Sequence, residues 1–266
     1  MKAAVCISGH LGQKPGRTPL IDVANSIQKF FSQLSIEVDY FLVLSFDENT
    51  SAELTEFYNH QFPVIQKKIF KDDSFPINSK KYTNIRKETH VERTYKMLDK
   101  ILSCNNLKKI HETSLNFKYD VVFRIRPDML FLDNKHSELQ SIITAGINDK
   151  HVYLPKFPWI ITKYTVVDFF AFGNSKTMDI YSEVINHIDS YYNKGLLFHP
   201  ETLLGFHLKS NGIKTYHINP ICFFSEKSLD MYGFEAEKNK RFSPYRILEL
   251  LKYIYYSYKP YIINNP

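Results

Sequence analysis

The sequence predicts an α/β fold with a mainly parallel, Rossmann-like sheet flanked by helices. Short apolar strands alternate with amphipathic helices through residues 3–70, the pattern of parallel strands joined by helical crossovers. The run Tyr119–Leu132 adds an apolar strand that ends in charged residues. The chain has 266 residues, 44% of them apolar, which suffices for one large domain.

Apolar spacing gives the order of the elements along the chain. Alternating or continuous apolar runs predict strands, and apolar residues three or four positions apart predict helices. The predicted strands are 3–8, 38–46, 64–70, 119–126, 151–155, 166–173 and 213–219. The predicted helices are 18–34, 50–60, 88–103, 175–188 and 200–212.

Capping residues mark where several of these helices begin and end. Thr18 precedes a proline, which is a common arrangement of N-cap and first helical residue. Thr50 and Glu53 have the spacing of a capping box. Pro200 begins the helix that Gly212 ends, since proline is favoured in a first turn and glycine just past a last one.

The central strand carries the strongest functional signal. Pro127 cannot donate a ladder hydrogen bond, so the strand stops there and leaves Asp128 on the following turn. Arg124, Arg126 and Asp128 therefore gather at the carboxyl end of a core strand, where open α/β sheets bind ligands. Such groups suit phosphate oxygens together with a divalent metal. An ion-paired strand end, in which one arginine neutralises Asp128, is the alternative and stays open.

Four other polar residues are candidates, each with a simpler explanation beside it. Asp168 lies among apolar neighbours and needs a partner or a ligand, because burying an unpaired carboxylate is costly. Glu201 is at a helix start, where capping alone explains a carboxylate. His217 lies in a strand, where a packed core histidine is the simpler interpretation, and Arg93 suits a solvated helix face.

Composition limits the classes of partner. A net charge of +6, from 34 Lys and Arg against 28 Asp and Glu, is too mixed for a dedicated nucleic-acid binder but favours anionic ligands or an anionic membrane surface. Three distant cysteines give no disulfide framework, and the amino terminus reads as a strand and not as a signal peptide. We expect a cytoplasmic protein, with peripheral contact at the inner membrane face as an alternative.

The chain divides at about residue 220. Residues 1–220 form the predicted catalytic domain, and 221–266 a carboxy-terminal extension. Within the extension, 243–258 has one apolar helical face accompanied by tyrosines, Lys and Arg, which suits a membrane interface. Docking of this helix on the domain's own core is equally open.

Four segments together resemble bacterial GT-A-type glycosyltransferases of capsule, O-antigen and lipooligosaccharide biosynthesis. They are I-S-G-H at 7–10, Y-D-V-V-F-R-I-R-P-D-M-L-F at 119–131, D-F-F-A-F-G at 168–173 and P-E-T-L-L at 200–204. The resemblance covers most of the chain to about residue 220. It implies a GT-A fold and transfer of a sugar from a nucleotide-sugar donor to a glycan or lipid-linked glycan acceptor.

The resemblance also implies roles for individual residues. Glu201 would be the catalytic base, with Asp168 as second candidate. GT-A enzymes hold a divalent ion with a D-x-D motif, and here R-I-R-P-D stands in its place, so Asp128 and the late His217 would be the metal ligands. Dependence on Mn²⁺ or Mg²⁺ stays open. The donor-binding residues would be Ser8, Gly9, His10, Arg17, Arg93, Arg124 and Arg126.

Two other classes of function remain alternatives. A sulfo- or phosphotransferase could use the same arginines, although the chain has no G-x-x-x-x-G-K-[ST] loop. A non-catalytic carbohydrate-binding protein could keep a degenerate form of the same site.

Overall fold

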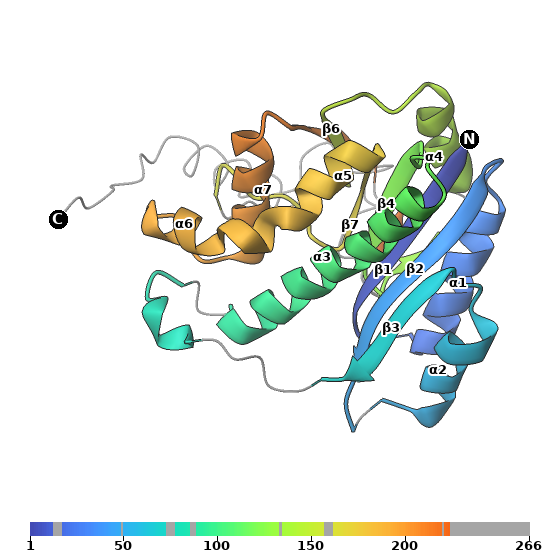
Figure 1. Cartoon of the computed structure of the whole chain (residues 1–266), viewed down its shortest axis with the longest axis horizontal. Coiled ribbons are helices and arrows are strands. Elements are labelled where there is room, and N and C mark those ends of the chain that lie inside the picture. Colours follow the sequence, from blue (N-terminus) through green and yellow to red (C-terminus); the bar gives the residue numbers. More distant parts are fainter. Residues whose placement is uncertain are drawn as a thin grey trace, which may run out of the picture.

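The computed structural model describes residues 1–12, 18–48, 50–72, 78–85, 89–132, 135–156, 162–219 and 221–223. A seven-stranded sheet in the order β3-β2-β1-β4-β7-β6-β8 forms its centre, and β5 and β9 pair separately (Figure 1). The strands are β1 (Lys2–His10), β2 (Glu37–Phe46), β3 (Gln66–Lys71), β4 (Val121–Ile125), β5 (Leu130–Phe131), β6 (His151–Pro155), β7 (Phe170–Gly173), β8 (Lys214–Ile218) and β9 (Cys222–Phe223).

The prediction of a mainly parallel sheet is confirmed. β1 pairs in parallel with both β2 and β4, β2 with β3, and β6 with β8. β4 is the middle strand, as expected for 119–126. β7 is antiparallel to both its neighbours and covers only 170–173 of the predicted 166–173. The chain from β6 to β7 carries no crossover helix among its described residues, and antiparallel neighbours need none.

Helices cover both faces of the sheet. They are α1 (Leu20–Ser32), α2 (Ala52–Glu56), π-helix η1 (Phe57–Gln61), 3₁₀ helix η2 (Ser79–Lys81), α3 (Val91–Ser114), α4 (His136–Thr144), α5 (Ser175–Ser182), 3₁₀ helix η4 (Glu183–His187), α6 (Ile188–Asn193) and α7 (Pro200–Ser210). α3 and α5 cross one face, and α1 lies on the other (Figure 1).

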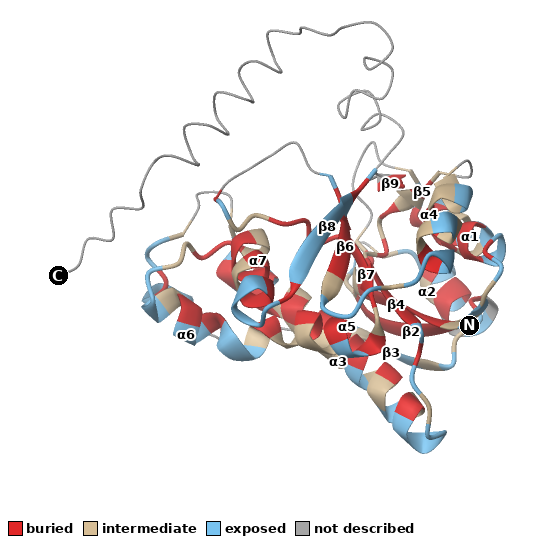
Figure 2. Cartoon of the chain, turned by 90° about the horizontal axis from the view of Figure 1, so that it is seen from above, coloured by how far each residue is buried: buried red, intermediate tan, exposed pale blue. Residues whose placement is uncertain are grey.

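The core on the α1 face is aromatic. The ring of Phe31 in α1 lies 5.0 Å from that of Phe123 in β4, and Phe123 lies 5.3 Å from Phe172 in β7. Tyr153 in β6 stacks on Phe172 at 4.8 Å, so the rings run across the sheet. Buried residues line the inner sides of the helices and strands (Figure 2). This packing fixes the position of β4, whose end carries the candidate site.

All five predicted helices differ from their predicted bounds, and α3 and α5 differ most. α3 runs to Ser114 instead of 103, because buried Lys108 and Glu112 pair with each other and break the apolar repeat that the prediction followed. The predicted helix 175–188 is interrupted by the 3₁₀ turn η4. The N-cap of α2 is Ser51, whose Oγ accepts a 3.2 Å hydrogen bond from the Leu54 N–H, and not Thr50.

Several sequence predictions fall outside the described residues. They concern Arg17 and the amphipathic tail 243–258. No helix in the described part of the chain combines the length and apolar character needed to cross a bilayer.

Candidate functional site

The candidate site lies at the carboxyl ends of β1, β2 and β4. β1 and β4 are in parallel register with Ile7 beside Ile125, so their ends meet at one edge. A Cβ placed on Gly9 would lie 2.6 Å from Pro127 Cδ. Only glycine therefore permits this approach, and the structure brings 8–10 and 124–128 together as the sequence predicted.

Arg126 and Asp128 form a bidentate ion pair across the turn that follows β4. Arg126 Nε donates to Asp128 Oδ1 at 2.9 Å, and Nη2 donates to Oδ2 at 2.8 Å. Burial disfavours the charged form of Arg126, but Asp128, Asp168 and Glu201 outweigh it, so the pKa of Arg126 is raised. The ion-paired strand end that the sequence left open is present, and two further carboxylates act on the same arginine.

Asp168 and Glu201 reach Arg126 from different elements. Asp168 precedes β7 and is 7% exposed, and within the described residues no side chain or backbone group hydrogen-bonds to it. Glu201 lies in the first turn of α7, where its backbone oxygen accepts a 3.3 Å hydrogen bond from the Val166 N–H. His199 Nδ1 lies 4.0 Å from Glu201 Oε2. The two candidate bases of the sequence therefore both raise the pKa of the same cation, Arg126.

Arg124 is buried with only one hydrogen-bond partner among the described residues. Its residue is 2% exposed, and Nη1 makes a single long hydrogen bond, 3.4 Å, to the Phe169 carbonyl oxygen. Nε and Nη2 have no hydrogen-bond partner in the described part of the chain. Burial lowers the pKa of Arg124, and the charge of Arg126 acts in the same direction, against Tyr181 and Asp168. A buried guanidinium with two orphaned donors favours an anion, and the described residues do not supply one.

Polar groups on β1 and β2 complete the edge. Ser8 is 1% exposed, and its Oγ has no partner among the described residues. His10 joins two strands, with Nδ1 3.3 Å from Ser45 Oγ and Nε2 3.1 Å from Asp47 Oδ2. Three strand ends thus face the same edge with donors and acceptors.

Sequence reasoning missed Tyr58. It lies in the π-helix η1 and is fully buried, and its hydroxyl has no partner in the described residues. Burial first, and the charge of Asp128 second, raise the pKa of Tyr58. Because a π-turn shifts side chains away from the 3.6-residue period, the helical pattern gave no sign that Tyr58 approaches Asp128. A short π-helix is itself a frequent mark of functional sites.

Two predicted residues lie away from this cluster. Arg93 is exposed on α3, which agrees with the simpler interpretation of its role. His217 is exposed on β8, not packed in the core, and β8 lies three strands from β4. At about 4.8 Å per strand this separates His217 from β4 by about 14 Å.

The residues present do not fit the metal site that the sequence suggested. Both oxygens of Asp128 receive hydrogen bonds from Arg126, and His217 belongs to a distant strand. Across the described ranges no group of three or more His, Cys, Asp or Glu side chains is placed to hold an ion. Positive charge at this edge comes from Arg124 and Arg126.

Comparisons with known proteins add no family assignment. No protein-family model and no curated protein matches the sequence. One similar solved structure is a putative glucose-1-phosphate thymidylyltransferase from Bacillus anthracis in complex with sucrose, at 10% identity over 91% of this chain and 96% of that chain, with TM-score 0.41. Another is apo mouse xyloside xylosyltransferase 1, at 9% identity over 82% and 85%, with TM-score 0.44. Likeness at this level carries no argument about activity.

Proposed function

We propose that the protein is a glycosyltransferase that moves a sugar from a nucleotide-sugar donor to a glycan or lipid-linked glycan acceptor in surface polysaccharide biosynthesis. The observation that carries this proposal is the buried Arg124, whose Nε and Nη2 have no hydrogen-bond partner among the described residues. Next along the strand, Arg126 is under the electrostatic influence of three carboxylates. Anion binding and proton transfer can therefore occur side by side at one strand edge.

The arginines would serve the donor. Transfer breaks the bond between the anomeric carbon and the diphosphate, so negative charge develops on the leaving group. Arg124 has two N–H groups without a partner among the described residues, and their contact with diphosphate oxygens would satisfy its buried charge. The Pro127 ring packs directly against Gly9, so the carboxyl ends of β1 and β4, where the diphosphate would lie, are held side by side.

A carboxylate would serve the acceptor. As the acceptor oxygen bonds to the anomeric carbon, its hydroxyl proton must pass to a base. Glu201 suits this role because its side chain is 16% exposed, reachable from solvent, at the start of α7. Asp168 interacts electrostatically with both Arg124 and Arg126. A carboxylate in that position is better suited to orient the donor or Arg126 than to accept a proton. Asp128 would hold Arg126 in place.

Native mass spectrometry of the protein with a panel of nucleotide sugars tests the proposal. We expect one nucleotide class to bind wild-type protein and release its sugar to an acceptor. Arg124→Gln should lose donor binding, while Glu201→Gln should bind the donor and lose turnover by roughly 10²-fold or more. Binding of another phosphorylated donor instead would indicate a sulfo- or phosphotransferase. Binding of sugars without any turnover would indicate a non-catalytic protein.

A further inference from the structure

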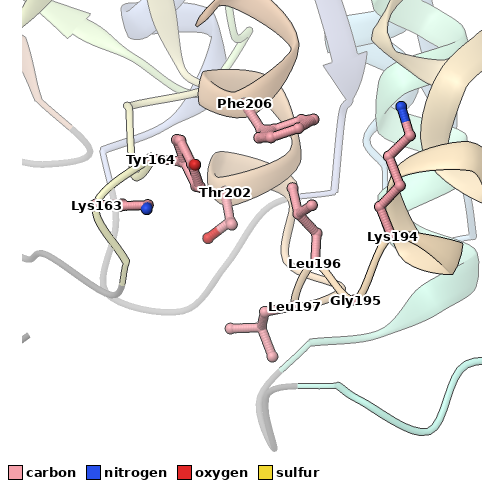
Figure 3. Close-up of a pocket in the computed structure, with 8 residues that line it drawn as sticks. All are labelled: Lys163, Tyr164, Lys194, Gly195, Leu196, Leu197, Thr202 and Phe206. Atoms are coloured by element: carbon pink, nitrogen blue, oxygen red, sulfur yellow. The ribbon is translucent and has the colours of Figure 1, made fainter. Parts of the chain in front are cut away.

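A cavity of about 220 Å³ opens beside the amino-terminal turn of α7 (Figure 3). Among the described residues, aromatic and aliphatic side chains form most of its wall, with two lysines and the hydroxyls of Tyr164 and Thr202, and no carboxylate lines it. The lining residues are Lys163, Tyr164, Lys194, Gly195, Leu196, Leu197, Thr202 and Phe206. Apolar walls with a few polar groups are typical of small-molecule sites.

One wall of the cavity is fixed by close packing of the backbone at Tyr164 against Gly205 in α7. A Cβ on Gly205 would lie 1.7 Å from the Tyr164 carbonyl oxygen, so only glycine lets the segment before β7 lie against α7. Thr162 Oγ1 lies 3.2 Å from Thr202 Oγ1, and this contact fixes the same segment a second time. The wall that carries Lys163 and Tyr164 is therefore firmly placed.

The lining has the chemistry of a site for a charged sugar. Tyr164 and Phe206 meet edge to face at 5.1 Å and give the cavity an aromatic corner. In Figure 3 the Lys163 amine points into the space between the two walls, while the Lys194 amine points away. The Lys209 amine lies 5.4 Å from the centre of the Tyr164 ring. The first turn of α7 adds positive potential, so an anion is favoured here.

We infer that this cavity is the acceptor subsite and takes a sugar ring that bears an anionic group, either a carboxylate or a phosphate. The ring would pack against Tyr164 and Phe206, with its anionic group on Lys163. The assignment of this cavity to the acceptor rests on the proposed function. Glu201, the proposed base, directly precedes the lining residue Thr202 in α7.

Saturation-transfer NMR and titration calorimetry on the full chain test the inference with three probes. Methyl β-D-glucuronide carries a carboxylate, glucose 6-phosphate a phosphate, and methyl β-D-glucoside no charge. We expect at least one anionic sugar to bind about tenfold more tightly than the neutral one, as one charge-assisted contact would give. Which of the two binds identifies the anionic group. Equal affinity of all three probes, or no binding, would overturn the inference.

A matched pair of variants assigns the preference to the cavity. Lys163 is exposed at the rim, so Lys163→Gln should fold normally and bind the anionic and neutral sugars equally. Lys176 is exposed on α5 outside the lining, and Lys176→Gln should keep the tenfold preference. If both substitutions reduced the preference for the anionic sugar equally, the preference would come from general charge attraction, and the site would be refuted.

The outcomes separate this inference from the proposed function. Arg124→Gln should abolish binding of a nucleotide sugar and leave the anionic sugar bound. If no nucleotide sugar binds wild-type protein but the Lys163-dependent preference is present, the subsite stands and the glycosyltransferase proposal fails. If the donor binds and turns over but no anionic sugar is preferred, the subsite fails alone.

Discussion

Replacing Arg124 with methionine should stabilise the protein and abolish donor binding. Methionine matches the aliphatic part of the arginine side chain, is apolar and adapts to irregular core space. Arg124 is 2% exposed, with Nε and Nη2 lacking partners in the described residues and Nη1 making one 3.4 Å hydrogen bond. The substitution therefore removes two unsatisfied buried donors and loses one weak bond.

The size of the effect follows from these groups. Each unsatisfied buried polar group costs about 1–3 kcal/mol, and a neutral hydrogen bond is worth about 1 kcal/mol. Two such donors less one hydrogen bond give a rise of about 1–5 kcal/mol in the free energy of unfolding of Arg124→Met. For this chain length that is about 2–10 °C in Tm. Loss of two charge-assisted bonds to a diphosphate, about 1.5–3 kcal/mol each, should weaken donor binding more than 100-fold.

Thermal melting without ligand and calorimetric titration with the donor measure the two effects. Lys108→Met is the matched control, because Lys108 is also a buried cation but contacts Asp179 at 2.7 Å and Glu112 at 3.2 Å. That variant should melt earlier and bind the donor normally. A lower Tm for Arg124→Met with retained donor binding would refute the reasoning, since Arg124 would then be a structural residue.

Three further predictions concern other parts of the fold. Glu112→Gln should destabilise the domain by about 3–5 kcal/mol at pH 7 in urea unfolding, because the Glu112 side chain pairs with two lysines. Burial disfavours the Glu112 carboxylate, but the lysines and hydrogen bonds outweigh it and lower the pKa of Glu112 in the folded protein. The stabilisation by Glu112 is therefore present above about pH 4.3, its pKa in the unfolded chain, and is lost as the pH falls through the lower pKa of the folded state. The difference in stability between Glu112→Gln and wild type should shrink over that pH range. Gly205→Ala should displace the 162–166 segment and weaken sugar binding in the cavity, with a lower Tm, and unchanged binding would contradict the packing argument. Asp128→Asn should free Arg126 and reduce turnover at least tenfold in a transfer assay, whereas full activity would leave the ion pair without a role.

The fold followed from the sequence where burial was apolar. The strand 119–126 and the β-α-β-α-β start were predictable because apolar alternation and helical spacing are unambiguous there. The end of α3 was not, because Lys108 and Glu112 occupy interior positions that pattern reasoning assigns to solvent. Their burial depends on partners from α5, which no local pattern shows.

The candidate site was predictable in part for a similar reason. Strand ends meet at one edge of a parallel sheet, so Ser8–His10 and Arg124–Asp128 could be placed together. Tyr58 and Asp47 could not, because one lies on a π-turn and the other pairs with His10 across strands. His217 was assigned to the site by resemblance alone, and strand order places it elsewhere.

Two buried charge clusters in this protein differ in how fully their groups are paired, and this difference separates structure from function. In the α3–α5 cluster Lys108 donates to Ser175 and Asp179, and Glu112 accepts from Ser175, Lys118 and the Tyr119 N–H. Such a network needs nothing from outside and holds two helices together. At the strand edge, Arg124 keeps two buried donors without partners in the described residues. Folding gains nothing from that arrangement, whereas a bound diphosphate would complete it, so the unfilled hydrogen bonds of Arg124 are the strongest reason to look for a ligand there.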